Sequence, residues 1–410
     1  MRHVLLLLIT CLIAALPAHA AQKIQGLAPG QPVVIGIAVP VFEEDEQIVR
    51  GAQLAADRIN ETGGISGHPI RLVIERAIPP RDGGLTDRIA ADTGRDLAIR
   101  MIEHNPIAVI GHDYSDGAVA ASQIYQDAGV LFLATFATDD SLTQHSFDLT
   151  FRVTIPIRYS SRALAHHAFE QKYCNLLMFA ERSHFGREKS LMLKQLIEDY
   201  GSQIVLSASF EDNTEDFQDI LLYVQDNKVF STSEIDAIIF LGSPLHAGDF
   251  IAQARRIGIK QPILGSPTLQ SPHTIEVAGD AMQDIVTYSL FDQTDRPDSW
   301  GRFAKNFENR YGSPPSDWSA LSFDSIGLLA NTIADAETVL QQQLARHLHS
   351  LAHIAPYKGV TGKIAFNLHG EIINREINLI SYQDGKFAAI TDWSGVDGEG
   401  SNDRASPLNC

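Results

Sequence analysis

The sequence predicts an α/β protein of two lobes, each built around a doubly wound parallel sheet with helices on both faces. Short apolar runs typical of buried strands alternate with longer segments of helical periodicity along most of the 410 residues. The alternation reaches Arg152-Val153 and begins again at Tyr159. Each of the two series is long enough to enclose its own hydrophobic core, which favours two lobes over one.

In the first series, strands and helices follow one another with short connections. The glycine-rich segment Gly63–Gly67 follows a helix, so it is interpreted as a turn and not as a phosphate loop, which needs a preceding strand. The predicted elements are strand Val33–Val39, helix Glu44–Glu61, strand Ile70–Glu75, helix Leu85–Glu103, strand Ile107–Ile110, a helix from about Asp116 that ends at Gly129, and strand Val130–Ala134.

The second series has the same alternation, and the chain then returns to the first lobe. Chain order places two later helices, Trp300–Tyr311 and Ser319–Glu337, back in the first lobe. The predicted elements of the second series are a helix from Tyr159 to Gln171, strand Asn175–Ala180, helix Arg187–Tyr200, strand Ile204–Ser209, helix Glu215–Asn227, strand Asp236–Gly242, helix Ala247–Ile257, strand Pro262–Leu264 and the extended segment Asp284–Leu290.

Two hydroxyl side chains follow two successive strands of the first series. Ser115 is placed like an N-cap of the helix after strand 107–110, and Thr138 is placed in the same way before a short helix at 139–144. Open α/β sheets bind ligands at the carboxyl ends of their strands, and helix N-termini there present N–H groups to an anion. The sequence therefore predicts that Ser115 and Thr138 hold a carboxylate or similar group of a small molecule. The alternative is that both residues are only helix caps.

The first 20 residues are typical of a secretory signal peptide. Arg2 precedes an apolar run over residues 4–15, and residues 18–20 supply an A-x-A cleavage site. We therefore expect export, with cleavage after Ala20. Lipoprotein processing at Cys11 is the alternative, although the residue before it is not the usual small Gly or Ala.

Composition and motifs exclude several classes of partner and cofactor. The formal net charge of −18 argues against nucleic acid and acidic membrane surfaces, and no later apolar run is long enough to insert into a membrane. Cys174 and Cys410 imply no disulfide framework. No cofactor is expected, because no G-x-G-x-x-G or Walker A motif occurs, and the absence of a G-x-S-x-G motif argues against nucleophilic hydrolase chemistry. His347, His349 and His353 lack the glutamate of a zincin helix, so they are interpreted as a polar helix face without a metal.

Three motifs follow one another between Gly111 and Gln144. They are G-H-x-x-S, then A-S-x-I-Y-x-D-x-G-V-L, then A-T-x-x-x-L-T-Q. In residue types, order and spacing, this stretch resembles the Leu/Ile/Val-binding proteins, which are type I periplasmic solute receptors of ABC importers. The pattern R-G-A-x-x-A-x-x-x-I-N-x-x-G-G-I-x-G from Arg50 to Gly67 is similar to the same family. Weaker resemblance extends from Val33 to about Ile390.

The resemblance implies a two-lobed type I periplasmic binding protein whose chain crosses three times between the lobes at a hinge. Residues 21–153 and 288–340 are assigned to the N-terminal lobe, 154–287 and 341–392 to the C-terminal lobe, and 393–410 to a disordered tail. The segment from Gly362 to Ile390 resembles the closing hairpin that the family has in its second lobe.

The resemblance also implies a function without catalysis. It describes an exported periplasmic receptor that closes over a small molecule and delivers it to an ABC permease in the inner membrane. In the family, the residues that match Ser115 and Thr138 bind the α-carboxylate of the ligand, and the carbonyl that matches Phe136 takes its ammonium. Asp113 and Tyr114, beside Ser115, are the other candidate ligand contacts in the first lobe.

The second lobe departs from the family pattern where ligand contacts are expected. Pro267 stands where an acidic residue usually pairs with the ammonium, and Ser243 or Pro244 replaces a tyrosine. Phe185 keeps the aromatic face of another tyrosine without its hydroxyl, and Ile157-Arg158 replaces an expected aspartate. Arg158 either adds positive charge to the site or lies on the surface beside the hinge. Because a buried ammonium without a carboxylate is costly, the predicted ligand is a carboxylate without an amine, or a neutral amide-like or aromatic molecule, and not a standard α-amino acid.

Three alternatives stay open at this point. The receptor serves a sensor kinase or chemoreceptor instead of an importer, or it binds a branched-chain amino acid through an altered ammonium site. The third alternative is an exported enzyme that uses His112, Asp113 and Asp116, although no set of nucleophile, base and orienting group is recognisable.

Overall fold

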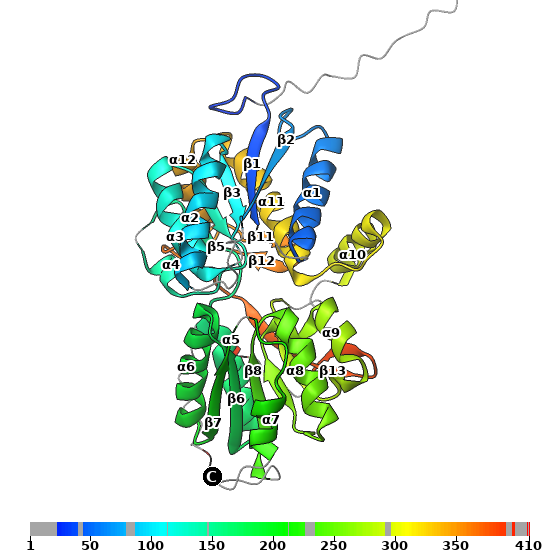
Figure 1. Ribbon diagram of the computed structural model, residues 1–410. Coiled ribbons are helices and arrows are strands. Elements are labelled where there is room, and N and C mark those ends of the chain that lie inside the picture. The colour runs from blue at the N-terminus through cyan, green and yellow to red at the C-terminus, as the bar shows by residue number, and fades with distance from the viewer. Residues whose placement is uncertain are drawn as a thin grey trace, which may run out of the picture.

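The computed structural model consists of two lobes joined end to end (Figure 1). The predicted signal peptide, Asp113 and most of the predicted tail lie outside the described residues. The structure describes residues 23–39, 44–78, 87–112, 114–145, 147–211, 213–225, 234–291, 297–390, 396–397, 408 and 410.

The first lobe contains a five-stranded parallel sheet in the order β2-β1-β3-β4-β5. Its strands are β1 (Val33–Val39), β2 (Ile70–Arg76), β3 (Ala108–Gly111), β4 (Leu131–Ala134) and β5 (Thr150–Arg152). Its helices are α1 (Glu44–Glu61), α2 (Asp87–Glu103), α3 (Ser115–Ala128), α4 (Ser141–Gln144), α10 (Pro297–Tyr311), α11 (Asp317–Ala336) and α12 (Gln341–Ser350).

Both faces of this sheet are covered, because its side chains alternate between two cores. Ile35 and Ile37 of β1 belong to the core that contains residues of α1 and α11, whereas Ala38 belongs to the core beneath α2 and α3. Helices α1 and α11 pack on each other, as do α2 and α3. The first lobe is therefore the doubly wound parallel sheet that the sequence predicts.

The second lobe contains a mixed sheet in the order β14-β13-β10-β9-β8-β6-β7, with β15 (Val396–Asp397) paired to β13. The strands from β6 to β10 are parallel, whereas β13 and β14 form an antiparallel hairpin beside β10. The strands are β6 (Asn175–Glu181), β7 (Gln203–Phe210), β8 (Ala237–Leu241), β9 (Ile263–Gly265), β10 (Ile285–Ser289), β13 (Glu376–Gln383) and β14 (Lys386–Ala389). The helices are α5 (Ile157–Glu170), α6 (His184–Asp199), α7 (Gln218–Gln225), α8 (Pro244–Arg256), α9 (Pro272–Ala278) and the 3₁₀ segments η2 (Pro267–Gln270) and η3 (Gly279–Met282).

The chain passes between the lobes three times. It leaves the first sheet after β5 and enters the second lobe at α5, and it returns to the first lobe between β10 and α10. The third passage lies between the short ribbon of β11 (Tyr357–Gly359) with β12 (Gly362–Ile364) and strand β13. The predicted two-lobed α/β fold with three crossings is confirmed, and the antiparallel edge of the second sheet is the predicted closing hairpin.

Helix α12 and the β11–β12 ribbon lie on the first lobe, so the assignment of the whole segment 341–392 to the second lobe is wrong. Helix α12 contacts α11 and β4, and the His349 and Phe151 rings have centroids 4.8 Å apart. In the ribbon, the N–H groups of Val360 and Thr361 donate to the carboxylate of Asp324 in α11, at 2.8 and 2.7 Å. The apolar side of α12 predicts that one face of this helix is buried. It does not indicate which of the two lobes covers that face, and this is why the assignment failed.

Cys174 and Cys410 form a disulfide, which the sequence analysis did not expect. Cys174 lies just before β6, and its Cα atom is 5.5 Å from that of Cys410, although 236 positions separate them. The N–H of Leu408 donates to the carbonyl of Tyr200 at 2.8 Å. These two contacts attach the end of the predicted tail to the second lobe. A pair so far apart in sequence leaves no spacing pattern, which is why composition alone did not predict it.

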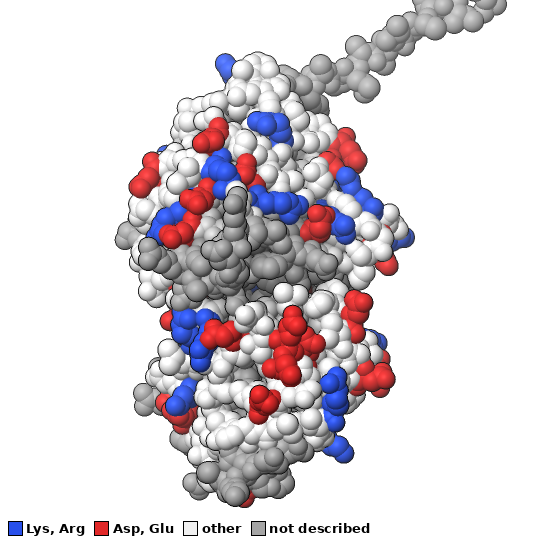
Figure 2. All heavy atoms as spheres, viewed as in Figure 1, with Lys and Arg blue, Asp and Glu red and all other residues white. Residues whose placement is uncertain are grey.

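Figure 2 shows the charged side chains on one face of the molecule. Lysine and arginine side chains are interspersed with acidic ones on the first lobe, and a group of acidic side chains lies at the centre of the second lobe. On this face, the described residues form no continuous basic surface of the kind that binds nucleic acid. Within the part of the chain that the structure describes, no helix combines the length and apolar character needed to cross a membrane.

Candidate ligand-binding site

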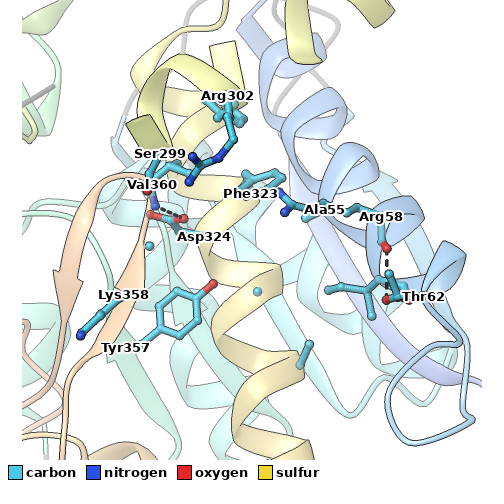
Figure 3. A pocket seen from close by; sticks show the side chains of 15 residues that line it. Ala55, Arg58, Thr62, Ser299, Arg302, Phe323, Asp324, Tyr357, Lys358 and Val360 are labelled. Atoms are coloured by element: carbon cyan, nitrogen blue, oxygen red, sulfur yellow. Dashed lines mark hydrogen bonds between the residues drawn. The ribbon is translucent and has the colours of Figure 1, made fainter. Parts of the chain in front are cut away.

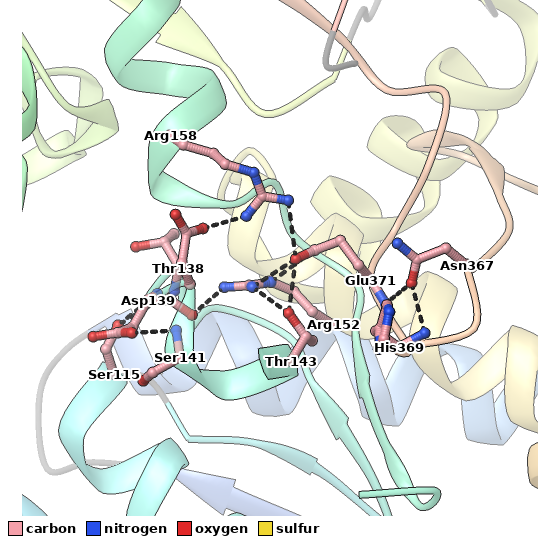
Figure 4. A network of polar contacts seen from close by, with 11 residues as sticks. Ser115, Thr138, Asp139, Ser141, Thr143, Arg152, Arg158, Asn367, His369 and Glu371 are labelled. Carbon is pink, nitrogen blue, oxygen red and sulfur yellow. Dashed lines mark hydrogen bonds and ion pairs between the residues drawn. The ribbon is translucent and has the colours of Figure 1, made fainter. Parts of the chain in front are cut away.

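Ser115 and Thr138 lie together at the carboxyl ends of two neighbouring parallel strands. Strand β3 leads to Ser115 at the start of α3, and β4 leads to the loop that contains Thr138. The Ser115 Oγ accepts hydrogen bonds from the backbone N–H groups of Thr138 and Asp139, both at 3.3 Å (Figure 4). The structure thus brings together the two residues that the strand-end pattern singled out.

Neither residue is the helix cap that the sequence analysis predicted. The N-cap of α3 is Tyr114, and α4 begins at Ser141 with Asp140 as its N-cap. The Ser115 hydroxyl oxygen accepts N–H groups of the neighbouring loop and not of its own helix. The Asp139 carboxylate accepts the N–H of Ser141 at 2.7 Å, and this turn delays the start of α4. The alternative that these hydroxyls are only helix caps is therefore wrong.

The two hydroxyl groups retain hydrogen atoms to donate. Because the Ser115 Oγ already accepts two N–H groups, its own O–H is left to act as a donor. The Thr138 hydroxyl makes no hydrogen bond within the described part of the chain, and both side chains are half-buried. Two adjacent O–H donors suit a ligand group with two acceptor oxygens, such as a carboxylate.

The other first-lobe candidates surround this pair. Phe136 is 4% exposed, and its ring packs on Trp318 of α11, with centroids 4.7 Å apart. No described residue donates to the Phe136 carbonyl, so this acceptor remains for a donor such as an ammonium or amide. Tyr114 is 37% exposed, and Asp113 lies outside the described residues. Trp318, which is 182 positions from Phe136 in sequence, was not predicted.

The second-lobe candidates occupy one edge of the second sheet. Phe185 is the second residue of α6 after β6, Ser243 is the N-cap of α8 after β8, and Pro267 begins η2 after β9. These strands are parallel neighbours, so their carboxyl ends lie side by side. Pro267 carries no charge, and its neighbour Ser266 bonds to Thr268 through hydroxyl groups 2.8 Å apart.

The carboxylate that ends β6 lies at this edge, but it is already engaged. Glu181 ends β6, and its Oε2 accepts the N–H of Ser243 at 2.9 Å and lies 3.3 Å from the Nδ1 of His246. The Ser243 Oγ lies 2.9 Å from the same Nδ1. Since serine and glutamate meet the same ring nitrogen, they do not form the hydroxyl–imidazole–carboxylate relay of a hydrolase, which uses both ring nitrogens.

His112 is not available as a base for the enzyme alternative. Its side chain is 3% exposed, and its Nε2 lies 2.9 Å from the Tyr125 hydroxyl. Burial lowers the pKa of His112 to about 3, so the ring is neutral and packed against Tyr125 and Phe132. Within the described residues, no group of three or more His, Cys, Asp or Glu is placed to hold a metal ion.

Arg158 forms ion pairs within the protein. Its guanidinium pairs with Asp140 and lies 3.5 Å from the Oε2 of Glu371 (Figure 4). Glu371 also binds Arg152, whose Nη1 donates to the carbonyl of Asp139 at 2.5 Å. The network holds the loop of Thr138 and Asp139 against the hinge. Arg158 is therefore a support of the site and not a free positive charge for a ligand.

A histidine of the second lobe bridges to two carboxylates beside the hydroxyl pair. The Nε2 of His184, the first residue of α6, lies 2.5 Å from the Oδ2 of Asp139, and its Nδ1 lies 3.4 Å from the Oδ1 of Asp116. The hydrogen bond with Asp139, together with Asp116 and Glu188, raises the pKa of His184. Sequence analysis missed this contact because no local pattern links α6 to residues of the other lobe.

The His184 contact predicts that the separation of the two lobes depends on pH. The raised pKa means that the form in which His184 meets Asp139 holds the proton more tightly, so this contact stabilises that form at low pH and is lost as the pH rises through that pKa. We expect the distance between spin labels on the two lobes to increase as the pH passes from below 6.5, the ordinary value, to well above it. In a His184→Gln variant this dependence should disappear. A wild-type separation that is constant over this range would contradict the prediction.

Comparisons with known proteins support this description of the fold. Residues 43–386 match the family model described as periplasmic binding protein. The Leu/Ile/Val-binding protein homolog 1 of Brucella suis is 22% identical over 346 residues, which are 83% of this chain and 87% of that protein.

Two solved structures are similar in fold. The branched-chain amino acid transporter substrate binding protein LivJ from Streptococcus pneumoniae, in complex with isoleucine, has a TM-score of 0.75 and 24% identity over 88% of this chain and 99% of that one. A solute binding protein of an ABC transporter from R. palustris, in complex with benzoate, has a TM-score of 0.75 and 17% identity over 92% and 99%. At these identities, the likeness establishes the fold.

Proposed function

Because the chain belongs to the periplasmic binding protein family, we propose that it is an exported receptor that captures a small carboxylate between its lobes and delivers it to an ABC permease. The family consists of solute-binding proteins of transporters and is not a class of enzymes. The resemblance of the 111–144 motifs to this family is thereby confirmed. The identity of the solute and its destination are the parts that we propose.

The pairing of Ser115 with Thr138 carries this proposal. Two O–H donors lie beside the point where His184 reaches across from the second lobe. A carboxylate at this point would accept from both hydroxyl groups while the second lobe covers it. Closure of the lobes then depends on the difference between the affinities of the open and closed forms for the solute.

We further propose that the solute lacks an α-ammonium. Pro267 offers no charge, and the nearby Glu181 is engaged with Ser243 and His246. The Asp116 and Asp139 carboxylates beside the hydroxyl pair are engaged with His184, so among the described candidates an ammonium would gain only the Phe136 carbonyl as an unengaged acceptor. Phe185 and Tyr114 supply aromatic surface instead. The benzoate complex of the R. palustris protein supports an aromatic acid, because benzoate combines a carboxylate and a ring with no amine.

Calorimetry of the mature protein tests both parts of the proposal. Benzoate, short aliphatic carboxylates and amides should be compared with leucine, isoleucine and valine. In a Ser115→Ala/Thr138→Ala variant, affinity for the bound carboxylate should fall by about 100-fold or more, because two charge-assisted hydrogen bonds are lost. Ser190→Ala removes a hydroxyl that bonds only within α6 and should leave affinity unchanged.

Two results would count against the proposal. Micromolar binding of leucine, isoleucine or valine, without binding of carboxylates that lack an amine, would favour the branched-chain amino acid alternative. Undiminished binding of the ligand by the Ser115→Ala/Thr138→Ala variant would remove these residues from the site.

A further inference from the structure

A second pocket lies on the first lobe, on the side of the sheet opposite α3. It has a volume of about 520 Å³ and lies between α1, α10, α11 and the β11–β12 ribbon (Figure 3). Helices α1 and α11 share a core that is separate from the core of α2 and α3, so this pocket is distinct from the site of Ser115. Nothing in the capture of a solute between the lobes requires it.

Two guanidinium groups reach over this pocket from different helices. Arg58 extends from α1 and Arg302 from α10, and the Tyr357 hydroxyl points toward the space between them (Figure 3). Lys358 also lines the pocket, but its amine points away from it. Burial raises the pKa of the Tyr357 phenol, so its hydroxyl stays protonated and can act as a hydrogen-bond donor. Arg58, Arg302 and Tyr357 therefore all present donors to the pocket.

The nearby carboxylates do not neutralise these arginines. Asp57, next to Arg58 on α1, pairs with Arg310. Asp324 lies in the wall of the pocket, but its oxygens accept the N–H groups of Val360 and Thr361 and the hydroxyl of Thr361. Neither Arg58 nor Arg302 forms an ion pair with any residue that the structure describes.

Both arginine side chains are exposed to solvent, but they face the same pocket and have no ion-pair partner among the described residues. Together they make the pocket locally positive in a chain with a net charge of −18. The forked donors of arginine match the paired oxygens of carboxylate and phosphate groups. The pocket also has room for a small multiply charged molecule, since its volume is in the range of ligand sites.

We propose that Arg58, Arg302 and Tyr357 form a binding site for a small oxyanion with two or more negative charges, either a phosphate ester or a polycarboxylate. Each guanidinium would bind one side of the anion, and the Tyr357 hydroxyl would donate from the floor of the pocket. The anion would tie α10 to α1 and α11, which pack around it. This site is independent of the proposed solute site.

Calorimetry of the full mature protein with inorganic phosphate and with citrate, at constant ionic strength, tests this inference. We expect at least one of the two anions to bind with a dissociation constant of about a millimolar or tighter. Phosphate binding without citrate binding assigns the site to phosphate esters, and the reverse assigns it to polycarboxylates. Arg58→Gln and Arg302→Gln should each weaken binding about tenfold or more.

Controls separate this site from general electrostatic attraction and from the solute site. Lys358→Gln removes the same charge from a residue that points away from the pocket, so it should leave the affinity within about twofold. The Ser115→Ala/Thr138→Ala variant should bind the anion as the wild type does, whatever the fate of the proposed function. Failure of the wild type to bind either anion, or equal binding by an Arg58→Gln/Arg302→Gln variant, would overturn the inference.

Discussion

Replacing Glu371 with alanine is expected to lower the free energy of unfolding by about 3–5 kcal/mol, because it leaves a buried guanidinium without its carboxylate. Arg152 is 0% exposed, and its Nε and Nη2 donate to the two oxygens of Glu371 at 2.8 and 2.7 Å. The remaining acceptors of Arg152, the Asp139 carbonyl and the Thr143 hydroxyl, carry no charge. Urea unfolding followed by circular dichroism measures the loss.

Two companion variants make this prediction specific. In an Arg152→Met/Glu371→Met variant both charges are absent, so most of the loss should be recovered. Glu211→Ala breaks an ion pair with Arg182 in which both side chains are 57% exposed, and this change should cost less than about 1 kcal/mol. If Glu371→Ala lowers the free energy of unfolding no more than Glu211→Ala does, the prediction is wrong. Arg152 would then be solvated by water or have found another partner in the variant.

The position of this pair explains why its loss should matter for function as well. Arg152 ends β5, where the chain first leaves the first lobe, and Glu371 lies in the third passage between the lobes. Through the Asp139 carbonyl, the same guanidinium holds the loop that contains Thr138. The pair therefore connects two strands of the hinge to the proposed solute site.

Local sequence patterns predicted the elements well because the physical causes of those elements are local. The bounds of β1 and α1 agree with the predicted Val33–Val39 and Glu44–Glu61, where apolar runs, helical periodicity and glycines mark each end. The proximity of Ser115 and Thr138 was also predictable, since each follows a strand after a short turn and those strands are neighbours. Assignment of α12 to a lobe failed because an amphipathic helix does not encode which surface will bury it.

The contacts that support the site were not predictable from the sequence. Arg152 and Glu371 are 219 positions apart, and His184 is 45 positions from Asp139. The residues of such pairs meet only when the folded chain brings distant segments together. No periodicity or local motif in the sequence therefore predicts them. Arg158 illustrates the consequence, because the sequence left open whether it adds charge to the site or lies on the surface beside the hinge, whereas the fold supplies Asp140 and Glu371 as its partners.

Lys189 presents the opposite case, a buried charge without a carboxylate partner among the described residues. Its side chain is fully buried between α5, α6 and the second sheet, and its Nζ donates to the hydroxyl groups of Ser160 and Tyr288 at 2.6 and 3.1 Å. The Nζ also lies 4.8 Å from the centre of the Tyr288 ring and 5.7 Å from that of Phe185. Burial lowers the pKa of Lys189 from 10.5 to about 7.

This shift predicts that the protein becomes more stable as the pH rises from about 7 to 10.5. Over this range the unfolded chain binds the Lys189 proton and the folded chain does not, so the free energy of unfolding increases with pH. Since one pKa unit corresponds to about 1.4 kcal/mol, the penalty at neutral pH has an upper bound of about 5 kcal/mol. Lys189→Met should therefore stabilise the protein by a few kcal/mol at pH 7, and the gain should shrink as the pH approaches 10.5.

The reference for this experiment lies on the same helix. Lys194 is half-exposed and pairs weakly with Glu198 at 3.9 Å, so Lys194→Met should change stability by no more than about 0.5 kcal/mol. Urea unfolding of both variants at several pH values separates the two residues. Destabilisation by Lys189→Met at pH 7 would mean that the bonds to Ser160 and Tyr288 outweigh the cost of burying the amine. The lysine would then be a structural tie between α5, which follows the first crossing, and β10, which precedes the second.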